Sequence, residues 1–271
     1  MLMKSKIWCI AAVFAYATAI GIPNVARASD LDVSDTPLFA AVSIDPNIIF
    51  TLDDSGSMQW EGMPVGWAYL FPQSLNPYGG ATYGRNIPRF RDNYFWNLRL
   101  RNPQTNGVFY NPELEYQPWA RADGTSFPDA DPDAALRNPA IPGNGALDLD
   151  DLNTWNNWSG GGPNDTGSNN QFWPITFYMY DGTGNVDNPV NHTKYQIRGN
   201  SAFAATPANA PMVPITSFLW PNGITRTIAE EKQNFANWFS YSRSRVLAAR
   251  NGIGRAFAEL PEQARVGFAA I

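Results

Sequence analysis

The amino-acid sequence predicts an α/β domain from three segments in the order strand, helix, strand. Residues 48–52 form a short apolar run, rich in β-branched residues, that is typical of a buried strand in a parallel sheet. Residues 227–260 have the apolar spacing of one long helix, and residues 265–271 form a second apolar strand. Two strands joined through a helix are the repeating unit of α/β folds.

The long helix is predicted from its ends as well as from its spacing. Thr227 and Glu230 have the spacing of a capping box, and Pro261 follows the last helical residue, Leu260. Six large apolar side chains fall largely on one face at helical spacing: Phe235, Trp238, Phe239, Val246, Ile253 and Phe257.

Residues 59–226 differ in character, and we interpret them as an insertion into the α/β unit. This segment of 168 residues holds 8 of the 10 Trp and many Gly- and Pro-rich turn sequences, but no convincing amphipathic helix. A structureless loop of this length is improbable inside a compact domain. We therefore expect the insertion to fold on itself, as mostly irregular chain with short strands and turns around its aromatic residues.

The N-terminus has the pattern of an export signal over residues 1–28. Two lysines precede a mostly apolar run from Ile7 to Ile20, and Ala26-Arg27-Ala28 has the small-residue spacing of a cleavage site. The run of 14 residues is short for a membrane span, and the alternative is an uncleaved N-terminal anchor. We expect an exported protein without a transmembrane span, beginning at a polar leader, residues 29–45.

The mature chain is expected to be acidic and free of cysteine. The signal carries three basic residues and the one cysteine, Cys9, so its removal changes the formal net charge from −5 to −8. An intrachain disulfide, a Cys-based zinc cluster and an iron–sulfur site are thereby excluded. The one histidine, His192, lacks a Gly-x-Ser-x-Gly partner motif, and we place it in an exposed polar loop without a catalytic role. The acidic balance argues against nucleic acid as a partner.

The motif Asp53-x-Ser55-x-Ser57 is the strongest chemical signal in the sequence. It directly follows the first predicted strand, and the carboxyl ends of parallel strands border the crevice where α/β folds bind ligands. One carboxylate and two hydroxyls are hard oxygen donors that suit Mg²⁺, Mn²⁺ or Ca²⁺. One carboxylate neutralises only part of the charge of a divalent cation. The cation is therefore expected to bind an acidic group of a partner as well. From these residues alone, the alternative is a Ser-rich turn that caps a helix.

Three segments together resemble one family. Residues 48–58, which end in Leu-Asp-Asp-Ser-Gly-Ser-Met, resemble the first strand and metal-ion-dependent adhesion site of a von Willebrand factor A domain. Residues 109–119, with Phe-Tyr-Asn-Pro and Tyr-Gln-Pro-Trp, are similar to a signature of the PilC/PilY family of type IV pilus tip adhesins and biogenesis factors. Residues 233–241, Gln-Asn-Phe-Ala-Asn-Trp-Phe-Ser-Tyr, resemble the family's helix that precedes an Arg-Val-Gly-Phe strand.

The resemblance implies a von Willebrand factor A-like, Rossmann-like domain over residues 46–271. It further implies a protein that is not an enzyme and that serves pilus assembly and adhesion at the cell surface or pilus tip, outer membrane-associated or periplasmic. Asp53, Ser55 and Ser57 would hold a divalent cation, Mg²⁺ or Ca²⁺. The cation would bridge to an acidic group on a host-cell or surface ligand, and pilus subunits would be further partners.

The A-like domain is expected to be incomplete at its C-terminus. In complete A domains, a Thr and a further Asp from later loops finish the metal site, and here those loops would lie beyond Ile271. We therefore expect a truncated N-terminal piece that binds metal weakly or not at all. The alternative is a short protein that takes its remaining strands from a partner.

Other patterns give weaker signals. Asp181, Thr183, Asn185 and Asp187 alternate like the start of a calcium loop, but Val186 stands where such a loop needs Gly, which favours an Asp/Asn-Gly turn. Arginines alternate with aromatic residues over residues 85–101, and we expect the arginines to pair with acidic groups while the rings pack inside. Two alternative functions remain: a secreted carbohydrate-binding surface module that uses exposed aromatics, and a secreted hydrolase with paired carboxylates.

Overall fold

The structure of the protein is a computed structural model, in which we describe five stretches of chain. These are residues 46–63, 68–72, 87–155, 171–259 and 264–270. The expected signal peptide and polar leader, residues 1–28 and 29–45, lie outside them. Among the described residues, no helix has both the length and the apolar character that crossing a membrane requires.

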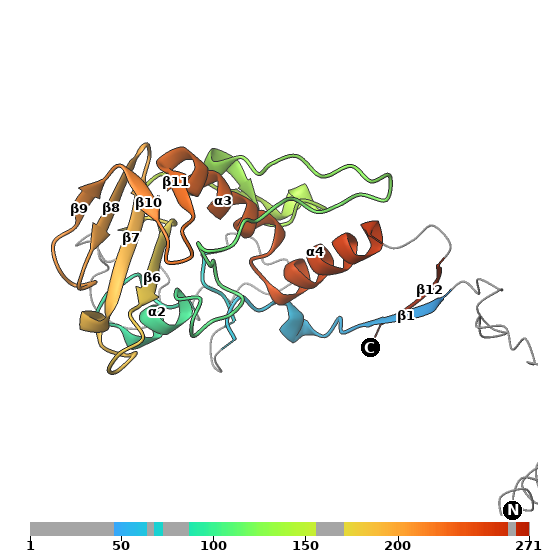
Figure 1. Ribbon diagram of the computed structural model, residues 1–271, viewed down its shortest axis with the longest axis horizontal. Helices are drawn as coiled ribbons and strands as arrows, with labels where there is room; N and C mark the ends of the chain where they lie inside the picture. Colours follow the sequence, from blue (N-terminus) through green and yellow to red (C-terminus); the bar gives the residue numbers. More distant parts are fainter. Residues whose placement is uncertain (1–45, 64–67, 73–86, 156–170, 260–263, 271) are drawn as a thin grey trace, which may run out of the picture. The chain divides into compact units, whose positions relative to one another are not determined.

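The predicted strand–helix–strand unit is confirmed. Strand β1 (Asn47–Leu52) pairs in parallel with β12 (Arg265–Ala270), from Asn47 opposite Arg265 to Leu52 opposite Ala270. Helix α4 (Arg245–Ala258) precedes β12 and packs on one face of the pair, where the ring centroids of Phe50 and Phe257 lie 4.4 Å apart (Figure 1).

The expectation that β1 is a buried strand is wrong for the described part of the chain. Exposed and half-buried residues alternate along β1, and Ile49 is 77% exposed. Phe268 of β12 is 65% exposed. A parallel strand is buried only when layers cover both faces of its sheet, and among the described residues only α4 covers this pair.

The prediction of one helix over residues 227–260 is also wrong, because the chain forms two helices, α3 (Ile228–Tyr241) and α4. The capping box at the start of α3 is confirmed: Thr227 accepts from the Glu230 N–H at 3.3 Å, and the Glu230 carboxylate accepts from the Thr227 N–H at 2.8 Å. The break falls at residues 242–244. There the Ser244 hydroxyl accepts from the Leu247 N–H at 3.4 Å and caps α4.

A four-stranded antiparallel sheet lies beside α3, with its strands in the order β6-β7-β8-β9. Its strands are β6 (Thr176–Tyr180), β7 (His192–Arg198), β8 (Ser201–Ala205) and β9 (Val213–Ile215). Phe177 of β6 stacks on Tyr195 of β7 with 5.4 Å between ring centroids, and on Phe235 of α3 with 6.5 Å. The side chains of one sheet face therefore join the core around α3.

The other elements of the insertion are short. Three two-stranded ladders form from β2 (Ala135–Leu136) with β3 (Ala146–Leu147), β4 (Asn153–Thr154) with β5 (Gln171–Phe172), and β10 (Ser217–Leu219) with β11 (Thr225–Thr227). The helices in the described part of the insertion are α2 (Phe95–Leu100) and the 3₁₀ turns η3 (Pro132–Ala134), η4 (Pro142–Asn144) and η5 (Pro189–Asn191), and the turn η1 (Gly56–Gln59) ends at the first residue of the insertion. Short strands and turns thus agree with the expectation for this segment.

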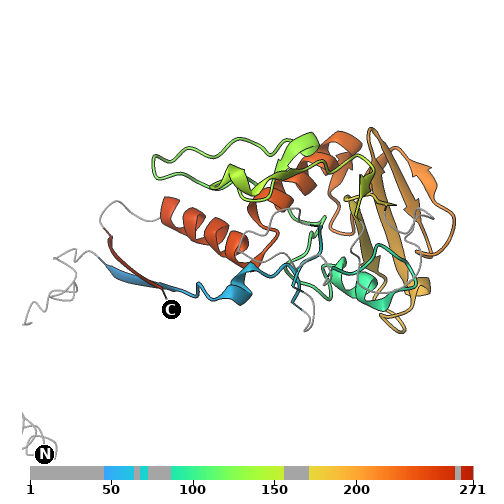
Figure 2. The same cartoon turned by 180° about the vertical axis from the view of Figure 1, so that it is seen from behind.

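Helix α3 organises the aromatic core. Figures 1 and 2 show α3 between the four-stranded sheet and the segment that carries β2 and β3. Trp238 of α3 is fully buried, and its ring contacts Phe71, Phe109 and Phe235 at centroid distances of 6.1, 4.9 and 5.0 Å. Most of the buried apolar side chains of the described part of the insertion therefore share one core with the helix that follows it in sequence.

Candidate metal centre

The structure brings Asp53, Ser55 and Ser57 together in one turn at the carboxyl end of β1. The Ser55 N–H donates to Asp53 Oδ1 at 2.8 Å, and the hydroxyl oxygens of Ser55 and Ser57 lie 3.1 Å apart. Asp53 and Ser55 are exposed, and Ser57 is half-buried. Three oxygen-bearing side chains are therefore accessible at the strand end where the sequence predicts a cation.

The capping alternative accounts for only part of this geometry. Turn η1 begins after Ser55, whose carbonyl oxygen accepts from the Met58 N–H at 2.9 Å. The Ser55 side chain, however, makes no capping hydrogen bond to η1. A capping serine normally accepts from such a backbone N–H, whereas the Ser55 hydroxyl is hydrogen-bonded to the Ser57 hydroxyl at 3.1 Å.

The donor set suits a hard divalent cation. Hydrogen bonds from the Ser55 N–H and hydroxyl lower the pKa of the Asp53 carboxyl below its ordinary value of 3.8, so the group is ionised at neutral pH. The two serine hydroxyls, hydrogen-bonded to each other at 3.1 Å, place two neutral oxygen donors in the same turn as this carboxylate. Among the described residues, no group of three His, Cys, Asp or Glu side chains forms a competing site.

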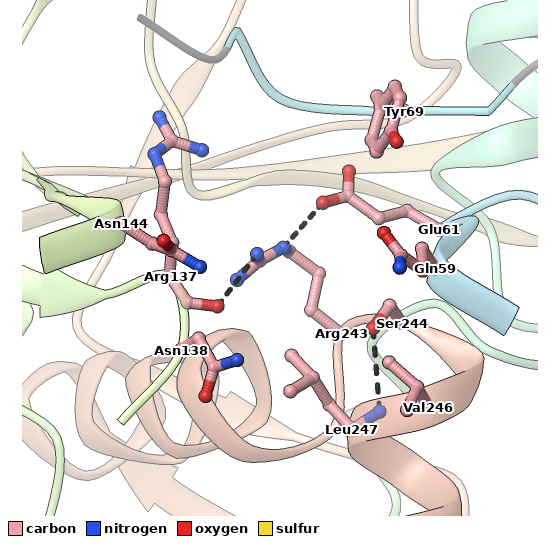
Figure 3. A pocket seen from close by; sticks show the side chains of 10 residues that line it. All are labelled: Gln59, Glu61, Tyr69, Arg137, Asn138, Asn144, Arg243, Ser244, Val246 and Leu247. Atoms are coloured by element: carbon pink, nitrogen blue, oxygen red, sulfur yellow. Dashed lines mark hydrogen bonds and ion pairs between the residues drawn. The ribbon is translucent and has the colours of Figure 1, made fainter. Parts of the chain in front are cut away.

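A buried ion pair anchors the loop that follows the motif. Glu61 accepts from the Arg243 Nε–H at 2.5 Å, and both side chains are almost fully buried (Figure 3). The second carboxylate oxygen of Glu61 accepts from the Leu70 N–H at 2.6 Å. Arg243 also donates to the carbonyl oxygens of Phe239 at 2.5 Å and Arg137 at 3.0 Å. This clasp joins the chain just after the motif to the junction of α3 and α4.

Arg245 forms a second connection to the same loop. Its backbone N–H donates to the Trp60 carbonyl at 3.2 Å, and its guanidinium donates to the Gly62 carbonyl at 3.1 Å and lies over the Trp60 ring. A cavity of ≈ 40 Å³ at this junction is lined by side chains that include Gln59, Glu61 and Arg243. The first residue of α4 therefore fixes the position of the loop that follows the motif.

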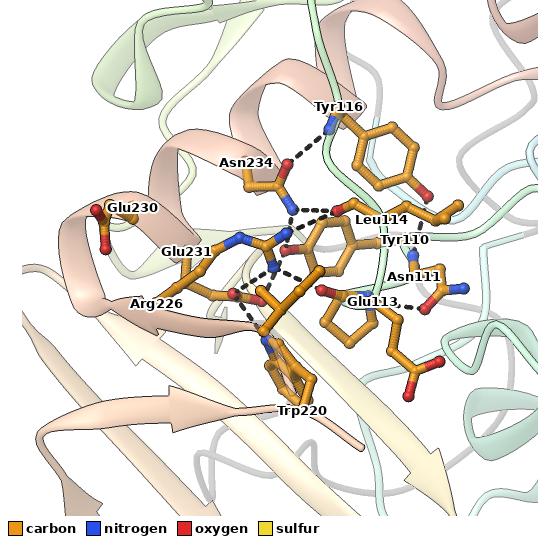
Figure 4. Close-up of polar contacts among 12 residues, drawn as sticks. Tyr110, Asn111, Glu113, Leu114, Tyr116, Trp220, Arg226, Glu230, Glu231 and Asn234 are labelled. Atoms are coloured by element: carbon orange, nitrogen blue, oxygen red, sulfur yellow. Dashed lines mark hydrogen bonds and ion pairs between the residues drawn. The ribbon is translucent and has the colours of Figure 1, made fainter. Parts of the chain in front are cut away.

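The two signature segments of the PilC/PilY resemblance contact one another. Asn234 of α3 accepts from the Tyr116 N–H at 2.7 Å, and the Trp119 indole N–H donates to the Tyr241 carbonyl at 2.7 Å. Beneath them, the buried Glu231 carboxylate accepts from the Tyr110 hydroxyl at 2.6 Å (Figure 4). These conspicuous sequence motifs are therefore structural, because they fix α3 to the insertion.

Buried polar residues complete this network, and the sequence analysis missed them. Glu231 also accepts from the Trp220 indole at 3.2 Å and from Arg226 at 3.2 Å. Burial raises the pKa of the Glu231 carboxyl, and its three donors oppose that shift. The sequence contained one signal of this burial. Glu231 is a charged residue at a position where the apolar spacing of the helix predicts a buried side chain.

The Asp181–Asp187 segment is a turn, in agreement with the favoured interpretation. Asp181 Oδ1 accepts from the Thr183 N–H at 2.8 Å, and Gly182 and Gly184 have positive φ angles. The Asp187 carboxylate is paired with Arg99 Nε at 2.5 Å. Both carboxylate oxygens of Asp187 therefore already accept from the Arg99 guanidinium, so Asp187 does not serve as a calcium ligand here.

The expectation that His192 is an exposed loop residue is wrong. It is the first residue of β7, is 1% exposed, and packs between Tyr178 and Tyr180 of the adjacent strand. Its Nδ1 lies 3.1 Å from the Asn188 carbonyl oxygen. The polar neighbours in sequence concealed this, because they belong to the preceding 3₁₀ turn.

We expect the stability of the protein to fall in mild acid because of His192. Burial lowers its pKa below the ordinary 6.5, although Asp181 and Asp187 oppose part of the shift. Between the two pKa values only the unfolded chain binds the proton, so the free energy of unfolding decreases as the pH falls below about 6.5. Denaturant titrations at pH 7.5 and 5.5 should show a larger loss for the wild type than for His192→Gln. Equal losses would contradict this assignment.

Comparisons with known proteins identify similar sequences. The chain is 27% identical over 255 residues to the type IV pilus biogenesis factor PilY1 of Pseudomonas aeruginosa strain PAO1, covering 89% of this chain and 17% of that relative. PilY1 of strain UCBPP-PA14 is 26% identical over 247 residues, with 90% and 17% covered. No protein-family model matches the chain, and no solved structure matches it. The chain spans 17% of the length of the curated relatives that it matches.

The similarity extends far beyond the short motifs, because it covers about nine-tenths of this chain. It includes the segments in which the signature residues Tyr116, Trp119 and Asn234 hold α3 to the insertion. The resemblance to the PilC/PilY family of type IV pilus biogenesis factors is therefore confirmed over most of the chain.

Proposed function

We propose that the chain is part of a type IV pilus-associated adhesin and biogenesis factor that binds its ligand through a divalent cation. Asp53, Ser55 and Ser57 hold the cation, Mg²⁺ or Ca²⁺, and an acidic group of the ligand takes an open coordination position. The partners are pilus subunits and an acidic host-cell or surface ligand. The location is outside the cytoplasm, at the pilus or cell surface, and the role involves no catalysis.

The observation that carries this proposal is the position of the motif at the end of a parallel strand. Asp53 directly follows β1, and β1 pairs in parallel with β12 after α4, which is the arrangement expected of a von Willebrand factor A-like domain. The hydroxyls of Ser55 and Ser57, 3.1 Å apart, add the oxygen donors that hard cations prefer. The names of the relatives support the pilus role.

The carbohydrate-binding alternative has less support. Stacking on a sugar requires an exposed aromatic face, and among the described residues every Trp is buried or half-buried. Trp119, Trp220 and Trp238 are all part of the core. Packing in the core around α3 therefore accounts for Trp119 and Trp220 of the insertion.

Removal of the Asp53 carboxylate tests the proposal. In the full-length gene product purified after export, Asp53→Ala is expected to lower Mn²⁺ affinity at least tenfold, on the order of the loss for a disrupted metal site. It should also abolish EDTA-sensitive adhesion while leaving secretion intact. Free Mn²⁺ measured by electron paramagnetic resonance gives the affinity, and cell binding with and without EDTA gives the adhesion.

Asp123→Ala is the matched control for this experiment. Asp123 is another exposed carboxylate that accepts from a hydroxyl residue two positions on, Thr125, at 2.6 Å, and those hydrogen bonds lower its pKa in the same way. This variant should bind Mn²⁺ like the wild type. Unchanged Mn²⁺ binding in Asp53→Ala, or equal loss in both variants, would refute the metal site.

A further inference from the structure

An open groove of ≈ 980 Å³ lies along the four-stranded sheet, and the metal motif forms no part of it. Its lining comes from β6 and β7, the β10–β11 turn, the loop after α2 and the loop after Tyr110. Strands and a packed core support most of these segments, so the groove is largely preformed. Concave surfaces that are largely preformed are typical binding sites.

Part of the groove lining is apolar. Met179 and Tyr195 are half-buried on adjacent strands, and Leu219 on the wall is 72% exposed. Trp220 is only 3% exposed, because its ring packs edge-on to Tyr195 with 5.0 Å between centroids and stacks on Phe218. The Trp220 ring therefore offers no free face for stacking on a sugar.

The charges that line the groove have one sign. Glu113 and Asp181 line it, and among the described residues no lysine or arginine does. Figure 4 shows the Glu113 carboxylate turned away from the buried network around Glu231. The guanidinium of that network, Arg226, is already paired with Glu231 at 3.2 Å. Asp181 is exposed, so the groove carries two carboxylates without a cation among its lining residues.

We propose that this groove binds an extended peptide segment of a partner protein that carries lysine or arginine side chains. The alkyl stems lie against Met179 and Leu219, while the cationic heads pair with Glu113 and Asp181. The formal net charge of the chain, −5 with the expected signal peptide and −8 without it, favours approach of a basic segment. This site goes beyond the proposed cation bridge and does not depend on Asp53.

The test uses a fluorescein-labelled decapeptide of Gly and Ser with two lysines, and the same peptide with both lysines acetylated. Fluorescence anisotropy with the full-length gene product should show binding of the lysine peptide that is at least tenfold tighter than binding of the acetylated one. Glu113→Gln and Asp181→Asn should each weaken binding about threefold to fivefold, as expected for partly exposed ion pairs. Asp53→Ala should bind the peptide like the wild type, which separates this site from the metal centre.

Glu115→Gln is the matched control, because it removes the same charge from an exposed residue that lies outside the groove lining. Its affinity should stay within about twofold of the wild type, as surface charges away from a contact act weakly. Thermal melting confirms that each variant is folded. Failure of the lysine peptide to bind, equal binding of the acetylated peptide, or equal weakening by Glu115→Gln would overturn the proposal. Tighter binding of neutral oligosaccharides that displaces the peptide would assign the groove to sugars instead.

Discussion

Replacing Trp238 with alanine is expected to lower the free energy of unfolding by about 3–5 kcal/mol, the range for removal of a large aromatic side chain from a core. Trp238 is fully buried, and its ring contacts Phe71, Phe109 and Phe235. Its indole N–H also donates to the Val108 carbonyl at 3.0 Å. The variant therefore loses packing on several sides and leaves a buried carbonyl without its donor. Urea denaturation followed by circular dichroism measures the loss.

Two variants serve as controls for this prediction. Trp238→Phe keeps part of the packing but removes the indole N–H, and should cost less than the alanine variant. Phe95→Ala removes an aromatic side chain that is exposed at the start of α2, and its effect should stay near 1 kcal/mol or below. A loss of under about 1 kcal/mol for Trp238→Ala would contradict the central position that we assign to this residue.

Arg243→Ala is expected to cost about 3–5 kcal/mol, because it leaves the Glu61 carboxylate buried without its cation. The pair is 2.5 Å apart, and the lost guanidinium also serves the Phe239 and Arg137 carbonyls. The loop after the metal motif loses its anchor as well. Urea denaturation gives the stability, and limited proteolysis should show faster cleavage near Gly62 than in the wild type.

Arg250→Ala is the matched control for the clasp. Arg250 is an exposed arginine of α4 that lies over the Trp119 ring, so its removal should change the free energy of unfolding by about 0.5–1 kcal/mol. The double variant Glu61→Gln, Arg243→Ala should recover part of the loss, because no uncompensated charge then stays buried. Strictly additive losses in this cycle would argue against a direct interaction between the two side chains.

Local sequence signals were sufficient for the positions of the two strands and for the start of α3. The β-branched run of β1, the Arg-Val-Gly-Phe run of β12 and the capping box at Thr227 depend on neighbours within a few residues, and all appear where the sequence predicts them. The turn at Asp53 is local in the same sense. Its serine hydroxyls lie together because alternate residues of one turn carry them.

The helix break and the supporting residues of the site depend on distant contacts. Nothing in the sequence around Arg243 opposes a helix strongly, and its arginine is a good helix former. Its partner, Glu61, is 182 residues earlier in the chain. The burial of His192 likewise follows from pairing opposite Tyr180. Such pairings arise from tertiary structure, which periodicity within a window of residues does not contain.

The pairing of β1 with β12 also bears on how the protein folds. Asn47 and Arg265 face each other across the two strands, so this ladder closes a loop that contains nearly the whole described chain. Contacts between residues so far apart in the sequence require a long loop to close. Closing this loop costs conformational entropy before the contacts stabilise the fold, so such contacts slow folding. Hairpins such as β6–β7 and β7–β8 close short loops by comparison. The order of assembly is therefore expected to begin with the sheet and α3, and the ladder beneath the metal motif is expected to form last.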